Sequence, residues 1–179
     1  PSLQRFTENV VHESVRLSDL LDRLLAMARL EKLESLPHRK SAVAIAALVQ
    51  EWQHSRYSLL AEKRLEVAVN EGTLLAEAET LKLALFNLLD NALRFANENT
   101  TITVHVDVAC LTVTNTGPVI PDYALGRITE RFYSLPAPGQ ERSSGLGLAM
   151  VSEIASLHGG SLNVENTHQG VQARLILPE

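Results

Sequence analysis

The sequence has few of the features that mark secreted, membrane-spanning or nucleic-acid-binding proteins. It contains one cysteine, Cys110, so no disulfide can form within the chain, which fits a reducing compartment. It has no apolar run of about 18 residues, the length that a membrane-spanning helix needs. Its first ten residues, PSLQRFTENV, are mostly polar and do not resemble a secretion signal. The net charge of −5 argues against a surface that binds nucleic acid.

What is present is an ordinary globular composition with a distinct front segment, residues 1–36. After Pro1 this segment lacks glycine and proline, and its apolar residues recur at spacings of three, four or seven, as in an amphipathic helix. The stripe is formed by Val10, Leu17, Leu21, Leu24 and Ala28. Such a helix cannot bury its own apolar face, so we expect it to pack on a partner helix, on the rest of the chain or on a second copy. Residues 37–40 (PHRK) are the predicted linker to a domain over residues 41–179.

Beyond the linker, strand and helix patterns are mixed. Alternating apolar and polar residues predict strands over 65–69, 101–108, 111–114, 161–165 and 171–177. Periodic apolar positions predict helices over 44–62, 77–96 and 145–157, and a short helix within 121–131. Because strands and helices do not alternate strictly, the predicted fold class is α+β, with helices layered on a largely antiparallel sheet.

Two asparagines share one face of the helix predicted over 77–96. Asn87 and Asn91 are four residues apart, so their side chains lie one turn from each other beside the apolar stripe. Asparagine is a modest helix former, so two of them in mid-helix call for a reason. An amide oxygen suits Mg²⁺, which takes few protein ligands, and Arg94 is placed to reach a phosphate. Spacing alone also allows two solvated or locally bonded amides.

A second candidate site is the glycine-containing segment 143–149 (SSGLGLA), which opens a predicted helix. Gly145 and Gly147 let the backbone approach a ligand closely, and the first N–H groups of a helix attract anions. The segment is therefore a candidate phosphate site, although a plain turn into a helix fits the same pattern. It lacks the Gly-Lys-Ser/Thr of a P-loop, and no clear strand directly precedes it as in a Rossmann fingerprint.

Together with three further segments, these two features resemble the sensor histidine kinases. Residues 87–95 (NLLDNALRF) resemble the N box of that family, and residues 115–121 (NTGPVIP) its first glycine box. Residues 130–133 (ERFY) resemble the end of the F box, residues 145–148 (GLGL) the second glycine box, and residues 158–160 (HGG) the motif after it. The motifs occur in the family's order and at fitting separations. Residues 120–125 (IPDYAL), 131–136 (RFYSLP) and 143–144 (SS) resemble, more narrowly, the carbon-source-responsive CreC type of these kinases.

The resemblance implies a Bergerat-type ATP-binding fold, a two-layer α/β sandwich, here preceded by the long amphipathic helix. It implies that Asn91, with Asn87 beside it, holds Mg²⁺ and that Arg94 contacts phosphate; these three are the predicted catalytic residues. It implies that residues 132–144 form a lid over ATP. The residues expected to bind the nucleotide are Asn91, Arg94, Phe95, Asn115, Gly117, Arg131, Ser144, Gly145, Leu146, Gly147 and Leu148.

Several positions depart from the pattern of the family, among them Ser143, which stands where another glycine is common. Asn115 stands where an aspartate accepts a hydrogen bond from the adenine amino group. Its amide oxygen also accepts, but a neutral bond is weaker by roughly 1 kcal/mol, or about fivefold in affinity. Val119 replaces a glycine, and because a β-branched residue resists positive φ, the loop must run at negative φ there. Thr129 replaces the first phenylalanine of the F box, which leaves less apolar anchoring for the lid.

The activity that the resemblance implies is transfer of the ATP γ-phosphoryl group to a histidine, for relay to a response regulator. His12 is not followed by the acceptor motif of the family, so the acceptor is expected upstream of this chain. Residues 1–36 are then the second helix of a hairpin that forms a homodimer. The parent protein is expected to be an inner-membrane sensor with this portion in the cytoplasm, and no nucleic-acid partner is expected.

The altered positions keep a second function open. The chain can instead be a non-catalytic module, responsive or blind to ATP, that controls a partner. An ATPase of the chaperone or topoisomerase type is disfavoured. Such enzymes usually carry a glutamate on the metal helix to activate water, whereas here Asn87 lies four residues before Asn91.

Overall fold

The computed structural model describes residues 2–33, 40–137 and 143–178, without the side chains of residues 2–4 and of His12. Residues 37–39 of the predicted linker and residues 138–142 of the predicted lid lie outside the described residues. The chain divides into two compact units, Pro1–Leu33 and Glu34–Glu179, which are described separately below.

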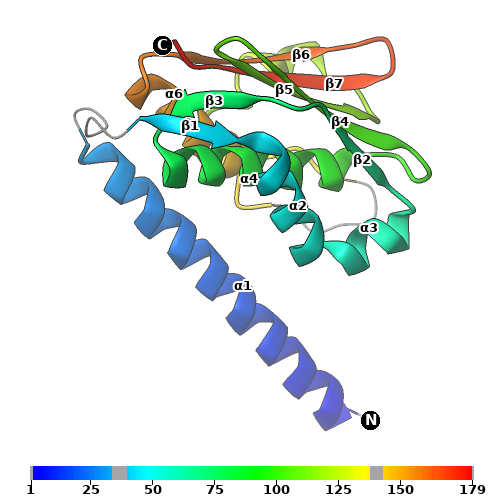
Figure 1. Cartoon of the computed structure of the whole chain (residues 1–179). Helices are drawn as coiled ribbons and strands as arrows, with labels where there is room; N and C mark the ends of the chain where they lie inside the picture. Colours follow the sequence, from blue (N-terminus) through cyan, green and yellow to red (C-terminus); the bar gives the residue numbers. More distant parts are fainter. Residues whose placement is uncertain (1, 34–39, 138–142, 179) are drawn as a thin grey trace. The chain divides into compact units, whose positions relative to one another are not determined.

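The first unit is the single helix α1 (Ser2–Glu31), of 30 residues (Figure 1). Its stripe side chains are largely exposed, with 49% of Val10, 58% of Leu17 and 57% of Leu21 accessible. The predicted long amphipathic helix is therefore confirmed. In the parts of the chain that the structure describes, no helix combines the length and the apolar content that crossing a membrane requires.

The second unit is built on a five-stranded sheet in the order β2-β4-β5-β7-β6 (Figure 1). Its strands are β2 (Glu66–Val69), β4 (Thr101–Asp107), β5 (Cys110–Thr116), β6 (Ser161–Asn166) and β7 (Gly170–Ile176). Strand β2 pairs in parallel with β4, and the other neighbours pair antiparallel. The largely antiparallel sheet follows the predicted alternation.

Alternating burial along the central strands separates the two faces of this sheet. On β4 every second residue is buried, from Ile102 to Val106, and the residues between them are exposed. On β5 the buried set is Leu111, Val113 and Asn115. Because successive side chains of a strand point to opposite faces, Asn115 is a polar residue on the packed face.

The helices in the described part of this unit are α2 (Ile45–Ser55), α3 (Tyr57–Lys63), α4 (Ala78–Phe95), α5 (Asp122–Leu125) and α6 (Gly147–Leu157). Helices α4 and α6 cover the packed face of the sheet, and α2 packs on α4 (Figure 1). Helices α4 and α6 pack on each other, α4 on β5 and α6 on β6. The fully buried side chains between the layers include Trp52, Leu85, Ile102, Leu111, Met150, Ile154 and Leu175. The predicted two-layer α/β sandwich is confirmed.

Three elements differ from the sequence prediction. The helix predicted over 44–62 is broken at Arg56, whose N–H bonds back to carbonyls of α2 while its φ and ψ of −116° and 12° leave the helical region. The helix predicted within 121–131 is confined to α5. A small antiparallel sheet of β1 (Ser41–Ala44) and β3 (Thr73–Ala76) was not predicted, because neither of their sequences, SAVA and TLLA, alternates polar and apolar residues.

His158 joins the end of α6 to the start of α4. Its Nδ1 lies 2.8 Å from the carbonyl oxygen of Ile154, which can only accept, so Nδ1 carries the proton and donates. Its Nε2 then accepts from the N–H of Glu77 at 3.3 Å. Burial lowers the pKa of His158, which favours this neutral form. Glu77 in turn caps α4, because its carboxylate accepts from the N–H of Thr80 at 2.8 Å.

Asp90 fixes the middle of α4 against α2. Its carboxylate accepts from Trp52 Nε1 at 2.9 Å, and from Arg56 Nε and Nη2 at 3.0 and 3.1 Å. A two-point bond between a guanidinium and a carboxylate sets orientation as well as distance. The rotation of α4 about its axis is thereby fixed, and with it the face on which Asn87 and Asn91 lie.

Lys63 closes the end of α4. Its Nζ donates to the carbonyl oxygens of Leu93 at 2.9 Å, Arg94 at 3.1 Å and Ala96 at 3.2 Å. The last carbonyls of a helix lack intrahelical donors, and a cation there also interacts favourably with the helix dipole. The end of α4 therefore keeps its helical geometry up to Phe95, although burial lowers the pKa of the Lys63 ammonium.

We expect Lys63→Met to lower the free energy of unfolding by about 1–3 kcal/mol, because three carbonyl oxygens lose a charged donor. The measurement is urea unfolding followed by the fluorescence of Trp52, the single tryptophan of the chain, which is fully buried. Lys82→Met is the matched control, because Lys82 forms a partly exposed ion pair with Glu51 at 2.6 Å. Equal stability of the two variants would contradict the capping role of Lys63.

Candidate functional site

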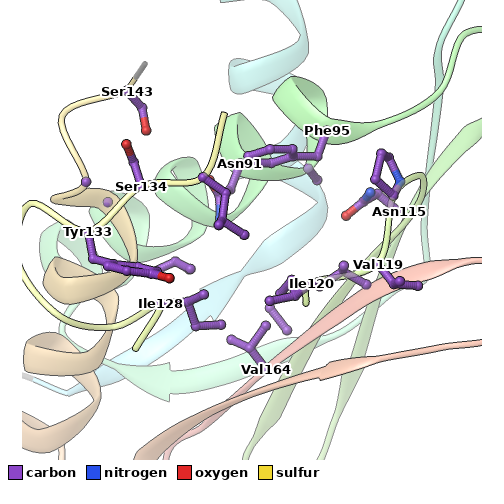
Figure 2. A pocket seen from close by; sticks show the side chains of 18 of the residues that line it. Asn91, Phe95, Asn115, Val119, Ile120, Ile128, Tyr133, Ser134, Ser143 and Val164 are labelled. Atoms are coloured by element: carbon purple, nitrogen blue, oxygen red, sulfur yellow. The ribbon is translucent and has the colours of Figure 1, made fainter. Parts of the chain in front are cut away.

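A cavity of about 330 Å³ lies beside α4, within the second unit (Figure 2). This volume is in the range of small-molecule sites. Its lining comes from the later turns of α4, the packed face of the sheet, and the loops between β5 and α6. The lining includes Leu88, Asn91, Ala92, Phe95, Val113, Asn115, Ile120, Ile128, Tyr133, Ser143, Gly145, Gly147, Leu148, Val171 and Ala173.

One end of the cavity is apolar apart from a single amide. The strand residues Val113, Val171 and Ala173 line it, and the pairing of β5 with β7 places them beside Asn115. Asn115 is 7% exposed, and Figure 2 shows its amide pointing into the cavity from the side of Val119 and Ile120. Its Nδ2 is buried without a hydrogen-bond partner. A flat apolar ligand with a polar edge fits this end.

The loop after β5 is held in place from both sides. A Cβ at Gly117 would overlap the carbonyl oxygen of Phe95, so only glycine allows this approach to the end of α4. On the other side Asn166 makes two bonds of 2.8 Å to the backbone of Ile120: its Oδ1 accepts from the N–H, and its Nδ2 donates to the carbonyl. Val119 does not adopt positive φ, as predicted.

The opposite end of the cavity is formed by the start of α6. Gly145 has a φ of +68°, and a Cβ there would lie 2.5 Å from the backbone carbonyl carbon of Phe132. The Gly145 carbonyl accepts from the N–H of Phe132 at 3.0 Å, so the two segments are packed backbone to backbone. Gly147 begins α6, and both Gly147 and Leu148 line the cavity. The free N–H groups of this first turn favour an anion.

The three predicted catalytic residues of α4 differ in their position relative to the cavity. Asn91 lines the cavity and lies between its two ends (Figure 2). Asn87 is buried one turn earlier, and its Nδ2 donates to the carbonyl of Leu83 at 2.8 Å. Arg94 is outside the lining, with its guanidinium carbon 5.7 Å from the centre of the Phe95 ring. Of the three predicted catalytic residues, only Asn91 therefore reaches the cavity in this structure.

The structure brings six of the eleven predicted nucleotide-binding residues to the cavity wall. Asn91, Phe95, Asn115, Gly145, Gly147 and Leu148 line it. Gly117, Ser144 and Leu146 lie next to lining residues, while Arg94 and Arg131 are not part of the wall. The roles of all these residues in binding stay predictions. Two residues that position the site, Asp90 and Asn166, were not singled out from the sequence, because their contacts are with residues distant in the chain.

Comparison with known families decides the class. Residues 76–179, more than half of the chain, match the family described as histidine kinase-, DNA gyrase B-, and HSP90-like ATPase. The chain belongs to this family. The matched range begins just before α4 and contains the whole cavity wall, so the site described above lies in the ATP-binding domain that defines the family.

The curated relatives are sensor kinases. The chain is 44% identical over 172 residues to the sensor protein CreC of Escherichia coli (strain K12), which is 93% of this chain and 36% of CreC. It is 31% identical over 176 residues to the probable sensor histidine kinase HK of Mycobacterium tuberculosis, 95% of this chain and 45% of that protein. The chain thus spans less than half the length of these relatives. The predicted resemblance to sensor histidine kinases, including the CreC type, is confirmed.

Solved structures agree with the sequence relatives. Full-length ShkA in complex with AMPPNP superposes with a TM-score of 0.76 at 27% identity, covering 96% of this chain and 38% of ShkA. The cytoplasmic segment of the histidine kinase QseC superposes with a TM-score of 0.61 at 23% identity, covering 92% of this chain and 93% of that segment, and supports the fold alone. The non-catalytic alternative is not favoured, because relatives and solved structures that this chain matches are named histidine kinases.

Proposed function

We propose that this chain binds Mg·ATP in the cavity beside α4 and transfers the γ-phosphoryl group to a histidine elsewhere in the whole protein. The observation that carries the proposal is the cavity itself, with an apolar end at Asn115, a helix N-terminus at Gly147 and Asn91 between them. Its position in a domain similar to the AMPPNP-bound ShkA supports a nucleotide as the ligand.

The two ends of the cavity suit the two ends of ATP. The purine is flat and largely apolar, and the end lined by Val113, Val171 and Ala173 offers apolar surface and one amide for its polar edge. The triphosphate is anionic, and the first turn of α6 at Gly147 offers N–H groups and a positive dipole end. The nucleotide would therefore lie with its base beside Asn115 and its phosphates toward α6.

The metal site would be completed by the nucleotide. In the described parts of the chain, no group of three or more His, Cys, Asp or Glu side chains could hold a metal ion. The amide oxygen of Asn91 fits Mg²⁺, which takes one or two protein oxygens and fills its shell with water and phosphate oxygens. Asn87, buried one turn earlier on the same helix, is the second proposed ligand.

The chemistry asked of this chain is mainly positioning. Phosphoryl transfer needs the acceptor, the γ-phosphoryl group and the leaving oxygen in line, with the developing charge neutralised by the bound Mg²⁺ and nearby cations. Arg94 and Arg131 are the proposed cations near the phosphates. The acceptor imidazole attacks in its neutral form, so the domain needs no general base. The phosphohistidine would then serve a response regulator, and the parent protein would be a membrane sensor with this portion in the cytoplasm.

We expect Mg²⁺ to tighten the binding of ATP to this chain. In Asn91→Ala, the ratio of the ATP affinities with and without Mg²⁺ should fall by at least about tenfold, the range for weakening a metal site. Calorimetric titration with ATP in MgCl₂ and in EDTA measures both. Asn163→Ala is the matched control, because Asn163 is an exposed asparagine on β6 away from the cavity. Absence of binding at millimolar ATP would favour a module blind to ATP, and an unchanged Mg²⁺ dependence in Asn91→Ala would place the metal elsewhere.

In the full-length protein, we expect [γ-³²P]ATP to label a histidine outside residues 1–179 with an acid-labile, base-stable phosphate. Asn91→Ala should slow the labelling at least about tenfold, because the metal that it holds orients the γ-phosphoryl group. Phosphopeptide mapping locates the label, and Asn163→Ala again serves as the control. Label found only on a residue within 1–179, or labelling that does not depend on Asn91, would contradict this mechanism.

Helix α1 is proposed to form a homodimer. Its stripe residues are largely exposed in this chain, and burying each apolar side chain of this size is worth about 1.5–3 kcal/mol. Four or five of them amount to several kcal/mol, comparable with the stability of a domain. Two identical stripes can pair about a twofold axis, as in a helical bundle. A second copy of α1 is therefore the occupant that we propose for this face.

Sedimentation of the chain tests this dimer. We expect the unchanged chain to sediment as a dimer and the double variant Leu17→Gln with Leu21→Gln as a monomer that still binds ATP. The matched control is Ser18→Gln with Asp22→Gln, which changes exposed residues outside the stripe. If the unchanged chain is monomeric, or if the stripe variant remains a dimer, the proposed role of α1 is wrong.

A further inference from the structure

Asn115 is the polar residue at the apolar end of the cavity, and in the described part of the chain no hydrogen bond fixes the orientation of its side-chain amide. The side chain is 7% exposed, and its Nδ2 is buried without a hydrogen-bond partner in the described structure. In Figure 2 the amide points into the cavity and its oxygen extends toward the side of Phe95 and Asn91. No hydrogen bond to the described residues therefore stabilises the present orientation of the amide relative to the orientation in which its oxygen and NH₂ group are exchanged.

The chemistry of an amide makes this freedom consequential. A half rotation about the last side-chain bond exchanges the oxygen and the NH₂ group, which differ little in size. In one orientation Asn115 presents an acceptor to the cavity, and in the other a donor. A carboxylate at this position could only accept. The side chain at residue 115 thus decides which polar edge of a ligand the apolar end tolerates.

We propose that this site accepts 6-oxopurine nucleotides as well as 6-aminopurine nucleotides, with Asn115 as the residue that determines this breadth. The proposal rests on the nucleotide site proposed above. With the amide oxygen toward the cavity, Asn115 accepts from the exocyclic amino group of adenine. With the NH₂ group toward the cavity, it donates to the 6-oxygen of hypoxanthine. The neighbouring wall, Val113, Val171 and Ala173, is apolar and adds no side-chain preference for either edge.

Guanine is expected to bind less well than hypoxanthine. Its additional 2-amino group brings two N–H donors into this end of the cavity, whose strand residues offer no side-chain acceptor besides Asn115. A buried donor without a partner weakens binding, because its bonds to water are lost and not replaced. The order of affinity that the site predicts is therefore ATP and ITP close together, with GTP behind both.

The test is calorimetric titration of the chain with ATP and ITP in the presence of Mg²⁺, for the unchanged protein and for Asn115→Asp. We expect the two affinities of the unchanged protein to differ by less than about tenfold, the energy of roughly one hydrogen bond. In Asn115→Asp, ATP should bind more tightly and ITP more weakly, because the carboxylate faces the 6-oxygen. The ATP-to-ITP ratio should therefore widen by about tenfold or more.

Comparing the two ratios isolates residue 115. Position N1 of the base also changes, from an acceptor in adenine to an N–H donor in hypoxanthine, and the comparison of the two ratios cancels every effect of N1 except a contact with residue 115 itself. Asn163→Asp, the same substitution on the exposed face of β6, controls for the added charge. If Asn115→Asp does not fold, as judged by the urea transition of Trp52, Asn115→Ala takes its place. It should weaken ATP and ITP by similar factors, because it removes donor and acceptor together.

The outcomes separate this inference from the function on which it rests. If the unchanged protein binds ATP but rejects ITP by the same ratio as Asn115→Asp, residue 115 does not set the breadth and the inference is wrong. Unequal losses for ATP and ITP in Asn115→Ala would overturn it as well. If neither nucleotide binds to the unchanged protein, the nucleotide site itself is wrong, and the inference falls with it.

Discussion

The structure of the second unit depends on the fixed position of helix α4. Three sets of contacts, all from other elements, hold it: the His158–Glu77 contact at its beginning, the Asp90 cluster with Trp52 and Arg56 in its middle, and Lys63 at its end. Each uses a charged or buried polar group with defined geometry, so together they fix both the rotation and the end of the helix. Asn91 and Phe95 reach the cavity only because α4 presents one particular face to it.

The same constraint explains the glycines of the site. Because α4 ends at a fixed point, the loop after β5 must pass against the Phe95 carbonyl, and Gly117 permits that approach. The start of α6 must likewise meet the backbone of Phe132, and Gly145 permits it at positive φ. A side chain at either position would displace a backbone segment of the cavity wall. These glycines therefore shape the site through packing, whatever ligand it holds.

Much of this fold could be predicted from local patterns. The alternation over 101–108 and 111–114 and the periodicity over 77–96 persist for long enough to define β4, β5 and α4. The motif order also predicted the cavity residues Asn91, Asn115 and Gly145. The contacts of Asp90, Lys63 and Asn166 could not be predicted, because each joins residues more than 25 positions apart and leaves no periodic signal. The spacing of Asn87 and Asn91 places both on one face of the helix but does not say which of them lies at the site. In the structure only Asn91 of the two lines the cavity.

The central claim is that the cavity between α4 and α6 holds the nucleotide, with the base at Asn115. The most direct measurement is the nitrogen–proton NMR spectrum of the ¹⁵N-labelled chain during titration with Mg·ADP, with the Asn115 side-chain signal identified by its loss in Asn115→Asp. The account predicts that this NH₂ signal and the backbone signals of Phe95, Gly145 and Leu148 shift together, while the side-chain signal of Asn163 stays in place. Chemical-shift changes that cluster away from the cavity wall, or an unchanged chemical shift of the Asn115 side chain at saturating nucleotide, would contradict it.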